Sequence, residues 1–122
     1  ISLGLVGSEM CIRDSYRGIS ELKKLAPTIL DVTHSVQKPN QSSGITSGSP
    51  EHIESLAKAG IVNSVDGIFL ETHTNPSEAK SDGSNMLDIK NLEKLLSNLL
   101  KLREVSSKLY SQLSYLCKSI VL

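Results

Sequence analysis

Blocks of hydrophobic and polar positions along this chain predict helices and strands in turn. Apolar residues at positions 19, 22 and 25 predict a short amphipathic helix over residues 18–25. Continuous apolar runs predict strands at residues 28–32 and 65–70, each covered on both faces. Between them, apolar positions 53, 56, 57 and 61 mark the buried face of a second helix, and a long helix is expected from about residue 88. This order predicts an α/β fold with parallel strands, which need further neighbouring strands for stability.

Capping signals predict where the two later helices begin. Ser49 is expected to cap the middle helix with its hydroxyl, ahead of Pro50 at the first helical position and Glu51 at the positive end of the helix dipole. Asp88 is expected to cap the long helix, which would place Leu87 and Leu92 as a hydrophobic staple.

Both predicted strands end in an acid, a threonine and a histidine. The first strand leads into Asp31, Thr33 and His34, and the second leads into Glu71-Thr72-His73. In open α/β sheets and in α/β barrels, active sites are built at the carboxyl ends of parallel strands. The repeated ending therefore predicts an enzyme active site at this edge of the sheet.

A histidine and two carboxylates are the strongest candidates for chemistry. His34, Glu71 and Asp82 combine an imidazole with hard oxygen ligands, a set that suits a divalent ion such as Mn²⁺, Fe²⁺ or Zn²⁺. In the alternative interpretation, His34 and Glu71 only cap the strand ends with hydrogen bonds. Asp31, Thr33 and His73 are expected to act as hydrogen-bonding groups that support the site.

A polar loop at residues 37–49 separates the first strand from the middle helix. Its length and its Ser, Gly, Asn and Gln content suggest a functional loop. The Ser-Gly pairs at 43–44 and 47–48 could offer backbone N–H groups to a phosphate near the helix start.

Composition excludes some classes of partner. Lysine plus arginine and aspartate plus glutamate balance at 13 each, so no bulk charge attracts nucleic acid or an acidic membrane surface. The chain has no apolar run of the roughly 20 residues needed to span a bilayer. Cys11 and Cys117 have neither metal-ligand spacing nor the density of a disulfide framework, which fits the cytoplasm. With 122 residues, the chain is one small domain or part of a larger one.

The first fifteen residues are expected to be non-native. Residues 5–14 match, codon for codon, the translation of a transposase adapter used in sequencing libraries. A signal peptide is the rival interpretation, but residues 1–7 are too short and lack a basic start. Residues 1–15 are therefore left out of the fold prediction, and the native chain would begin near residue 16, inside a longer protein.

The C-terminal stretch allows two interpretations. Leucine and isoleucine follow a heptad seam broken only by Ser106, which suits a non-catalytic helical oligomerisation module. The apolar stripe also includes Leu96, Leu100 and Val105, and a stripe of this width suits a helix that covers a sheet. The covering helix is favoured as far as Tyr110, and residues 111–122 are assigned as a helical extension of uncertain origin.

Several ordered motifs resemble one enzyme family. Residues 31–37 (DVTHSVQ), 65–73 (VDGIFLETH), 75–83 (NPSEAKSDG) and 102–110 (LREVSSKLY) resemble 3-deoxy-D-manno-octulosonate 8-phosphate synthases over residues 16–110. The related 3-deoxy-heptulosonate 7-phosphate synthases share some of these elements, but usually carry Pro-Ser-His where this chain has Val32-Thr33-His34. The octulosonate enzymes are therefore the preferred family, with the heptulosonate enzymes as the alternative.

The resemblance implies that residues 16–110 are the C-terminal part of a (β/α)₈ TIM barrel, comprising strands seven and eight with their helices. It implies a homotetrameric enzyme that condenses phosphoenolpyruvate with arabinose 5-phosphate and releases phosphate for lipopolysaccharide synthesis. By the same resemblance, His34, Glu71 and Asp82 are metal ligands, with a fourth, cysteine ligand in the N-terminal half, and His34 and Asp82 carry the catalysis. A piece of the barrel alone is expected to be inactive.

The resemblance also assigns substrate-binding positions. It places Gln37 near the reacting water and substrate, and aligns Thr46 and Ser47 with a loop near the sugar phosphate. The family commonly has Gly-Gly-x-Arg here, whereas residues 47–50 of this chain are Ser-Gly-Ser-Pro. Ser81, where metal-independent members often have cysteine, favours the metal-dependent class without excluding the other.

Overall fold

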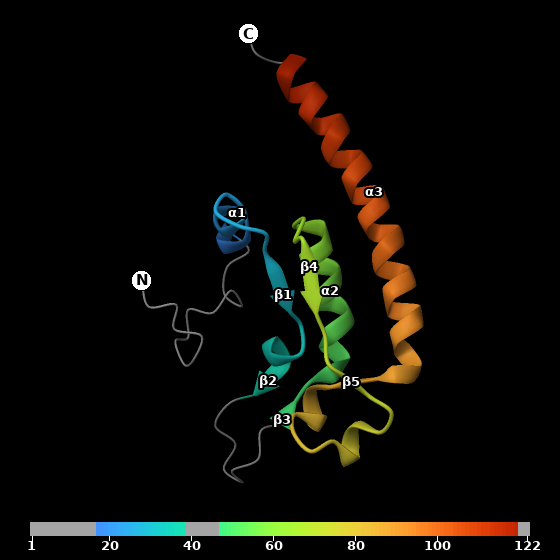
Figure 1. Ribbon diagram of the computed structural model, residues 1–122. Coiled ribbons are helices and arrows are strands. Elements are labelled where there is room, and N and C mark those ends of the chain that lie inside the picture. Colours follow the sequence, from blue (N-terminus) through green and yellow to red (C-terminus); the bar gives the residue numbers. More distant parts are fainter. Residues whose placement is uncertain (1–16, 39–46, 120–122) are drawn as a thin grey trace.

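The computed structural model describes residues 17–38 and 47–119, and the predictions for residues 1–15, for the pair at 43–44 and for Thr46 lie outside these ranges. Figure 1 shows a short parallel pair of strands beside two long helices. The helices are α1 (Arg17–Lys23), α2 (Ile53–Val62) and α3 (Leu92–Ser119). The strands are β1 (Ile29–Asp31), β2 (Gln37–Lys38), β3 (Ser47–Gly48), β4 (Gly67–Phe69), β5 (Thr72–His73) and β6 (Leu87–Asp88).

The two predicted strands pair in parallel, as expected from the order of the elements. In β1 and β4, Ile29 lies opposite Gly67, Leu30 opposite Ile68 and Asp31 opposite Phe69. The connection between these strands contains α2, so the three elements form a βαβ unit, and α3 follows β4 as the next covering helix. This alternation is the repeating pattern of a (β/α)₈ barrel, and the chain has the architecture of two consecutive units of such a barrel.

The core lies between the strands and the two long helices. α2 turns Ile53, Ala57 and Ile61 inward, and α3 contributes Leu95 and Leu99 to the same cluster. These positions follow the predicted helical spacing, because residues three and four apart share one face of a helix. Tyr110 also donates a hydrogen bond from its hydroxyl to the Val62 carbonyl at 2.7 Å. α3 therefore covers α2 through Leu95 and Leu99, whereas Leu96, Leu100 and Val105, which were expected in the same apolar stripe, are exposed.

The strands are more exposed than the sequence predicts. Ile29 is 62% exposed and Phe69 is 45% exposed, although both were expected to be covered. The cause is the small size of the sheet, since β1 and β4 each have only one partner strand in the described part of the chain. An apolar run in a parallel sheet indicates burial by the whole sheet, which two strands cannot supply.

The start of the middle helix also differs from the prediction. Pro50–His52 form a turn of 3₁₀ helix before α2, and the Ser49 hydroxyl makes no capping hydrogen bond. Ser49 is instead buried beside β3, where its backbone N–H donates to the Val36 carbonyl at 3.2 Å. Asp88 caps a 3₁₀ turn at Ile89–Asn91 and not α3 itself, which begins at Leu92; its carboxylate accepts the Lys90 N–H at 2.9 Å.

Two small ladders were not predicted. β2 pairs antiparallel with β3 and closes the base of the polar loop, while β5 pairs parallel with β6 and closes the loop that carries Asp82. Each ladder has only two residues per strand, too short to give a periodic pattern in sequence. Within the described residues, no helix is both long and apolar enough to cross a membrane.

Candidate metal centre

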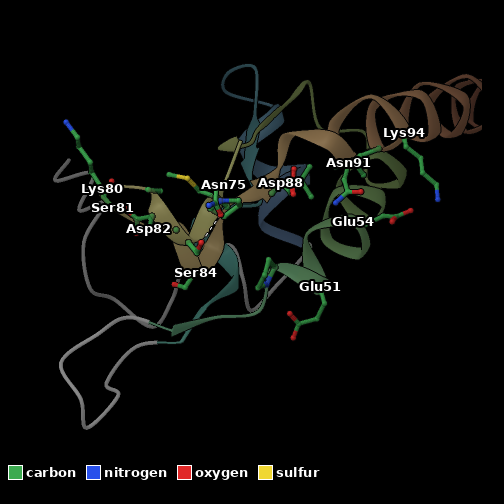
Figure 2. Close-up of a pocket in the computed structure, with 18 residues that line it drawn as sticks. Glu51, Glu54, Asn75, Lys80, Ser81, Asp82, Ser84, Asp88, Asn91 and Lys94 are labelled. Atoms are coloured by element: carbon green, nitrogen blue, oxygen red, sulfur yellow. Dashed lines mark hydrogen bonds between the residues drawn. The ribbon is translucent and has the colours of Figure 1, made fainter. Parts of the chain in front are cut away.

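A groove lies beside the loop that carries Asp82, and neither His34 nor Glu71 lines it. Its walls are the loop at residues 75–84, the 3₁₀ turn before α2 and the first turns of α3, and its volume is about 1070 Å³. Figure 2 shows Glu54, Asp88 and Lys94 on the helical side of this groove and Asp82 on the loop side. The groove is therefore bounded by the same loop that carries the third candidate ligand.

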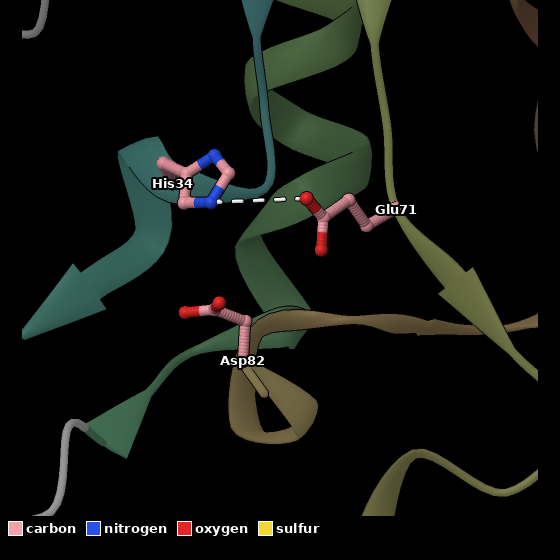
Figure 3. A group of neighbouring side chains, drawn as sticks. All are labelled: His34, Glu71 and Asp82. Atoms are coloured by element: carbon pink, nitrogen blue, oxygen red, sulfur yellow. Dashed lines mark ion pairs between the residues drawn. The ribbon is translucent and has the colours of Figure 1, made fainter. Parts of the chain in front are cut away.

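The structure brings His34, Glu71 and Asp82 together. One ligand atom from each of these side chains lies within 4.8 Å of the other two. Figure 3 shows His34 on the turn after β1, Glu71 on the segment after β4 and Asp82 on the following loop. His34 Nε2 lies 3.8 Å from Glu71 Oε1. Because β1 and β4 run in parallel, their carboxyl ends deliver these groups to one edge.

His34 is held by Asp31 and Phe69. Its Nδ1 lies 2.7 Å from Asp31 Oδ2, and its backbone N–H donates to Asp31 Oδ1 at 2.9 Å. The imidazole also stacks on the Phe69 ring, with 6.1 Å between centroids and 21° between planes. With Nδ1 bonded to a carboxylate, Nε2 is the nitrogen that faces Glu71.

The pKa of His34 is raised above its ordinary value. The largest cause is the hydrogen bond to Asp31, and the negative charges of Asp31, Glu71 and Asp82 add to it. Partial burial of the ring acts in the opposite direction and offsets part of the increase. The local field therefore favours positive charge at this position.

Glu71 is fixed through its backbone. Its N–H donates to the hydroxyl oxygen of Thr33 at 2.7 Å, and its carbonyl accepts the Leu87 N–H at 3.1 Å. Thr33 is fully buried, and its own N–H donates to Asp31 Oδ1 at 3.0 Å. These hydrogen bonds fix the position of the Glu71 backbone relative to His34.

Asp82 occupies a backbone conformation that most residues avoid. Its φ is 51°, in the left-handed region, where aspartate is one of the better-tolerated residues after glycine. Its carboxylate Oδ1 accepts a hydrogen bond from Gln37 Nε2 at 2.8 Å. Gly83 follows, and a Cβ there would lie 2.1 Å from the Pro76 carbonyl oxygen. A tight turn thus presents Asp82 to the other two side chains.

The cluster carries more negative charge than its surroundings balance. Among the side chains described at residues 18–37 and 48–111, no lysine or arginine forms an ion pair with Asp31, Glu71 or Asp82. One imidazole and two carboxylates, with the imidazole oriented by a third carboxylate, match the ligand chemistry of a divalent transition metal. The residues present therefore fit such an ion.

The other predicted residues lie at different distances from the cluster. Gln37 contacts Asp82 directly, as described above. Ser47 lies in β3, paired with Lys38. His73 turns away into its own loop, where its Nδ1 lies 3.0 Å from the Asn75 backbone nitrogen. His73 is therefore not part of the candidate group formed by His34, Glu71 and Asp82.

Sequence reasoning missed three residues that shape the site. Phe69 stacks on His34, Gly83 permits the turn after Asp82, and Asn85 is fully buried against Gly48. The Asp-Gly pair at 82–83 was a visible turn signal. The contacts of Phe69 and Asn85 depend on packing between distant segments and leave no local sign in the sequence.

The fold and the cluster together define an α/β-barrel protein with a histidine–carboxylate site at the carboxyl ends of its strands. The sequence profile of the DAHP synthetase I family matches residues 14–108, and the chain belongs to this family.

Relatives in this family share a common name. The chain is 47% identical over 90 residues to a 2-dehydro-3-deoxyphosphooctonate aldolase of Fusobacterium nucleatum, which covers 73% of this chain and 32% of the relative. Aldolases of the same name from Koribacter versatilis and Agrobacterium fabrum are 43% and 49% identical over 91 and 75 residues. These matches cover 72% and 62% of this chain, and 33% and 27% of the relatives. The chain thus spans about a third of the length of the curated relatives it matches.

A solved structure supports the same fold. The crystal structure of a phospho-2-dehydro-3-deoxyheptonate aldolase (DAHP synthase) from Thermotoga maritima matches with a TM-score of 0.59 and 25% identity. The match covers 75% of this chain and 24% of that one. The predicted fold class, part of a TIM barrel, and the predicted family are both confirmed.

Proposed function

We propose that residues 16–110 are the C-terminal part of a cytoplasmic synthase that condenses phosphoenolpyruvate with arabinose 5-phosphate. The products are 3-deoxy-D-manno-octulosonate 8-phosphate and inorganic phosphate, and water is consumed. The pathway served is lipopolysaccharide synthesis. Residues 1–15 are proposed to be non-native, and residues 111–122 a helical extension. The observation that carries the proposal is the convergence of His34, Glu71 and Asp82 within 4.8 Å, in a chain 40–49% identical to phosphooctonate aldolases.

In this proposal, His34, Glu71 and Asp82 hold a divalent ion of manganese, iron or zinc. When bound, such an ion supplies Lewis acidity that orients the sugar aldehyde and polarises its carbonyl or a water. His34 offers Nε2, because Asp31 occupies Nδ1. Asp82 offers a carboxylate whose orientation is set by the Gln37 amide at 2.8 Å. A cysteine in the N-terminal part of the barrel completes the ligand set.

Substrate contacts in this chain are proposed for Gln37, Thr46 and Ser47. Gln37 lies next to the cluster, so its position suits a contact with the reacting groups. Thr46 and Ser47 belong to the loop at 38–49, which would approach the sugar phosphate. This loop lacks the arginine common in the family, so the phosphate charge must be balanced by residues from earlier strands. This piece alone is therefore expected to be inactive.

The proposal is tested on the complete protein, recovered by extending the reading frame upstream. About 150 further residues with six βα units are expected, since a typical barrel has ~250 residues. The purified protein should release phosphate from phosphoenolpyruvate when a five-carbon aldose phosphate is added. A preference for a four-carbon sugar phosphate would instead identify the heptulosonate reaction, because the product would have one carbon fewer. A reading frame without upstream βα units would contradict the proposal.

Metal dependence and assembly are tested on the same protein. Removal of divalent ions with a chelator should abolish turnover, and added Mn²⁺, Fe²⁺ or Zn²⁺ should restore it. Full activity in the chelated protein would identify the metal-independent class. The homotetramer implied by the family is measured by light scattering, where a monomer at working concentration would contradict it.

A further inference from the structure

We propose that Asp31 and Thr33 are positioning residues of this site: Asp31 selects the nitrogen that His34 presents, and Thr33 fixes the spacing between the strand ends carrying His34 and Glu71. This inference rests on the proposed metal-dependent function. It assigns roles to two residues that neither bind the ion nor touch the substrate. Both lie at the end of β1, on the same turn as His34.

Asp31 uses both oxygens of its carboxylate. Oδ1 accepts the backbone N–H groups of Thr33 and His34 at 3.0 and 2.9 Å, and Oδ2 faces His34 Nδ1 at 2.7 Å. A carboxylate can only accept hydrogen bonds when ionised, so His34 must carry its proton on Nδ1. When the ring is in its neutral form, this arrangement leaves the lone pair on Nε2, the nitrogen 3.8 Å from Glu71 Oε1. Asp31 thereby prepares His34 as a ligand.

Thr33 connects the two strand ends. Its hydroxyl oxygen accepts the Glu71 N–H at 2.7 Å, across a sequence separation of 38 residues. Its own N–H is held by Asp31 Oδ1, so one carboxylate and one hydroxyl link His34 to Glu71. Thr33 is fully buried, so its hydroxyl is shielded from bulk water while it accepts the Glu71 N–H. Loss of the Thr33 hydroxyl should therefore make the position of Glu71 relative to His34 more variable.

The substitution Asp31→Asn should keep the contacts to the backbone while it changes which nitrogen of His34 carries the proton. The asparagine amide can still accept the two backbone N–H groups through its oxygen. Its NH₂ group would then face Nδ1 and donate to it, so the His34 proton would move to Nε2. A protonated Nε2 cannot bind a metal ion. Asp66→Asn is the matched control, because Asp66 also accepts a backbone N–H, from Thr28 at 2.8 Å, and is not part of the cluster.

The experiment measures Mn²⁺ affinity of the complete protein by electron paramagnetic resonance, with thermal unfolding as a check. Asp31→Asn should weaken Mn²⁺ binding about 10- to 100-fold, the range typical for residues that orient metal ligands. Asp66→Asn should leave the affinity unchanged. Thr33→Val should weaken binding, and Thr33→Ser, which keeps the hydroxyl, should restore it. Unchanged affinity in Asp31→Asn, or equal affinities for the valine and serine variants, would overturn the assignment.

A second measurement does not require bound metal. Nitrogen-15 spectra of the metal-free protein, at a pH where the ring is neutral, report which His34 nitrogen carries the proton. We expect Nδ1 in the parent protein and Nε2 in Asp31→Asn, with His34→Ala identifying the signal. If the parent binds no Mn²⁺ but shows this exchange, the metal function fails and the positioning role stands. If Mn²⁺ binds and the proton lies on Nε2 in both proteins, the positioning role fails.

Discussion

The two ends of the β1–β4 pair use carboxylates in different ways. At the amino end, Asp66 Oδ2 accepts the Thr28 N–H, and Asp66 Oδ1 lies 3.6 Å from the Lys23 ammonium. At the carboxyl end, Asp31, Glu71 and Asp82 gather around His34, and the described residues supply no lysine or arginine partner. The amino end is electrostatically balanced, whereas the carboxyl end keeps an excess of negative charge.

This difference suggests that the amino end of the strand pair contributes to stability and the carboxyl end to catalysis. In (β/α)₈ barrels, the amino-terminal face of the strands serves stability and the carboxyl-terminal face carries catalysis. The charge of Asp66 is already neutralised by a neighbouring lysine. The carboxylates around His34 have no such partner among the described side chains, so a bound cation would neutralise their excess negative charge. Changes at the carboxyl end should therefore act on metal binding and turnover, and changes at the amino end on stability alone.

The largest effect is expected for His34→Ala in the complete protein. If His34 is a metal ligand as proposed, removal of its imidazole should lower turnover by at least about 10³-fold, or roughly 4 kcal/mol of transition-state stabilisation. Steady-state phosphate release measures the loss. Near-normal turnover in a folded His34→Ala protein would mean that the carboxyl end is not the reaction centre.

A smaller effect on both stability and metal binding is expected for Gly83→Ala. The new methyl group would lie 2.1 Å from the Pro76 carbonyl oxygen, so the turn that presents Asp82 must move. Overpacking of this kind costs about 1–3 kcal/mol. Chemical denaturation gives the stability change, and Mn²⁺ titration gives the affinity. Gly18→Ala is the control, because its Cβ would meet no atom within 4 Å.

Tyr110→Phe tests the packing of α3 against the last residue of α2, Val62. The variant loses the hydrogen bond from the tyrosine hydroxyl to the Val62 carbonyl, with little change in shape. The loss should be about 0.5–1.5 kcal/mol of unfolding free energy, because Tyr110 is half exposed and water can replace the donor. Denaturant unfolding measures it. A loss of Mn²⁺ affinity in this variant would contradict the conclusion that changes away from the carboxyl end affect stability alone.

The smallest effect is expected for Asp66→Asn, and it should depend on pH. The hydrogen bond from the Thr28 N–H, and secondarily the Lys23 charge, hold the pKa of Asp66 below its ordinary value. A lowered folded-state pKa stabilises the protein above the unfolded pKa of about 4, and this contribution disappears as the pH falls through the folded-state pKa. The parent should therefore unfold at a slightly higher temperature than Asp66→Asn at pH 7. The two midpoints should converge as the pH falls below the folded-state pKa of Asp66, and a constant difference throughout the acid range would contradict the assigned cause.

The main elements, and the meeting of His34 and Glu71 at one edge, were predictable because their signals are local. Helical spacing gave α2 and its buried Ile53, and acid–histidine endings marked the two strands. Parallel pairing then required His34 and Glu71 to meet at one edge. The cap expected from Ser49 was wrong, because the chain first forms a 3₁₀ turn and buries Ser49 beside β3.

The supporting contacts were not predictable from sequence. The stacking of Phe69 on His34 and the bond between Gln37 and Asp82 join segments 35 and 45 residues apart, and no local pattern encodes such a register. The exposure of Ile29 likewise depends on how many strands flank β1. Local sequence patterns therefore predict the elements, whereas the contacts between distant elements depend on tertiary packing.

The exposed flanks of β1 and β4 have a practical consequence for laboratory work. Ile29 and Phe69 present apolar surface beside backbone groups that can still pair with another strand. Unprotected edges of this type recruit strands from other molecules. Bacterial overproduction of these 122 residues by themselves should therefore yield inclusion bodies, and co-production with the remaining barrel strands should return the polypeptide to the supernatant.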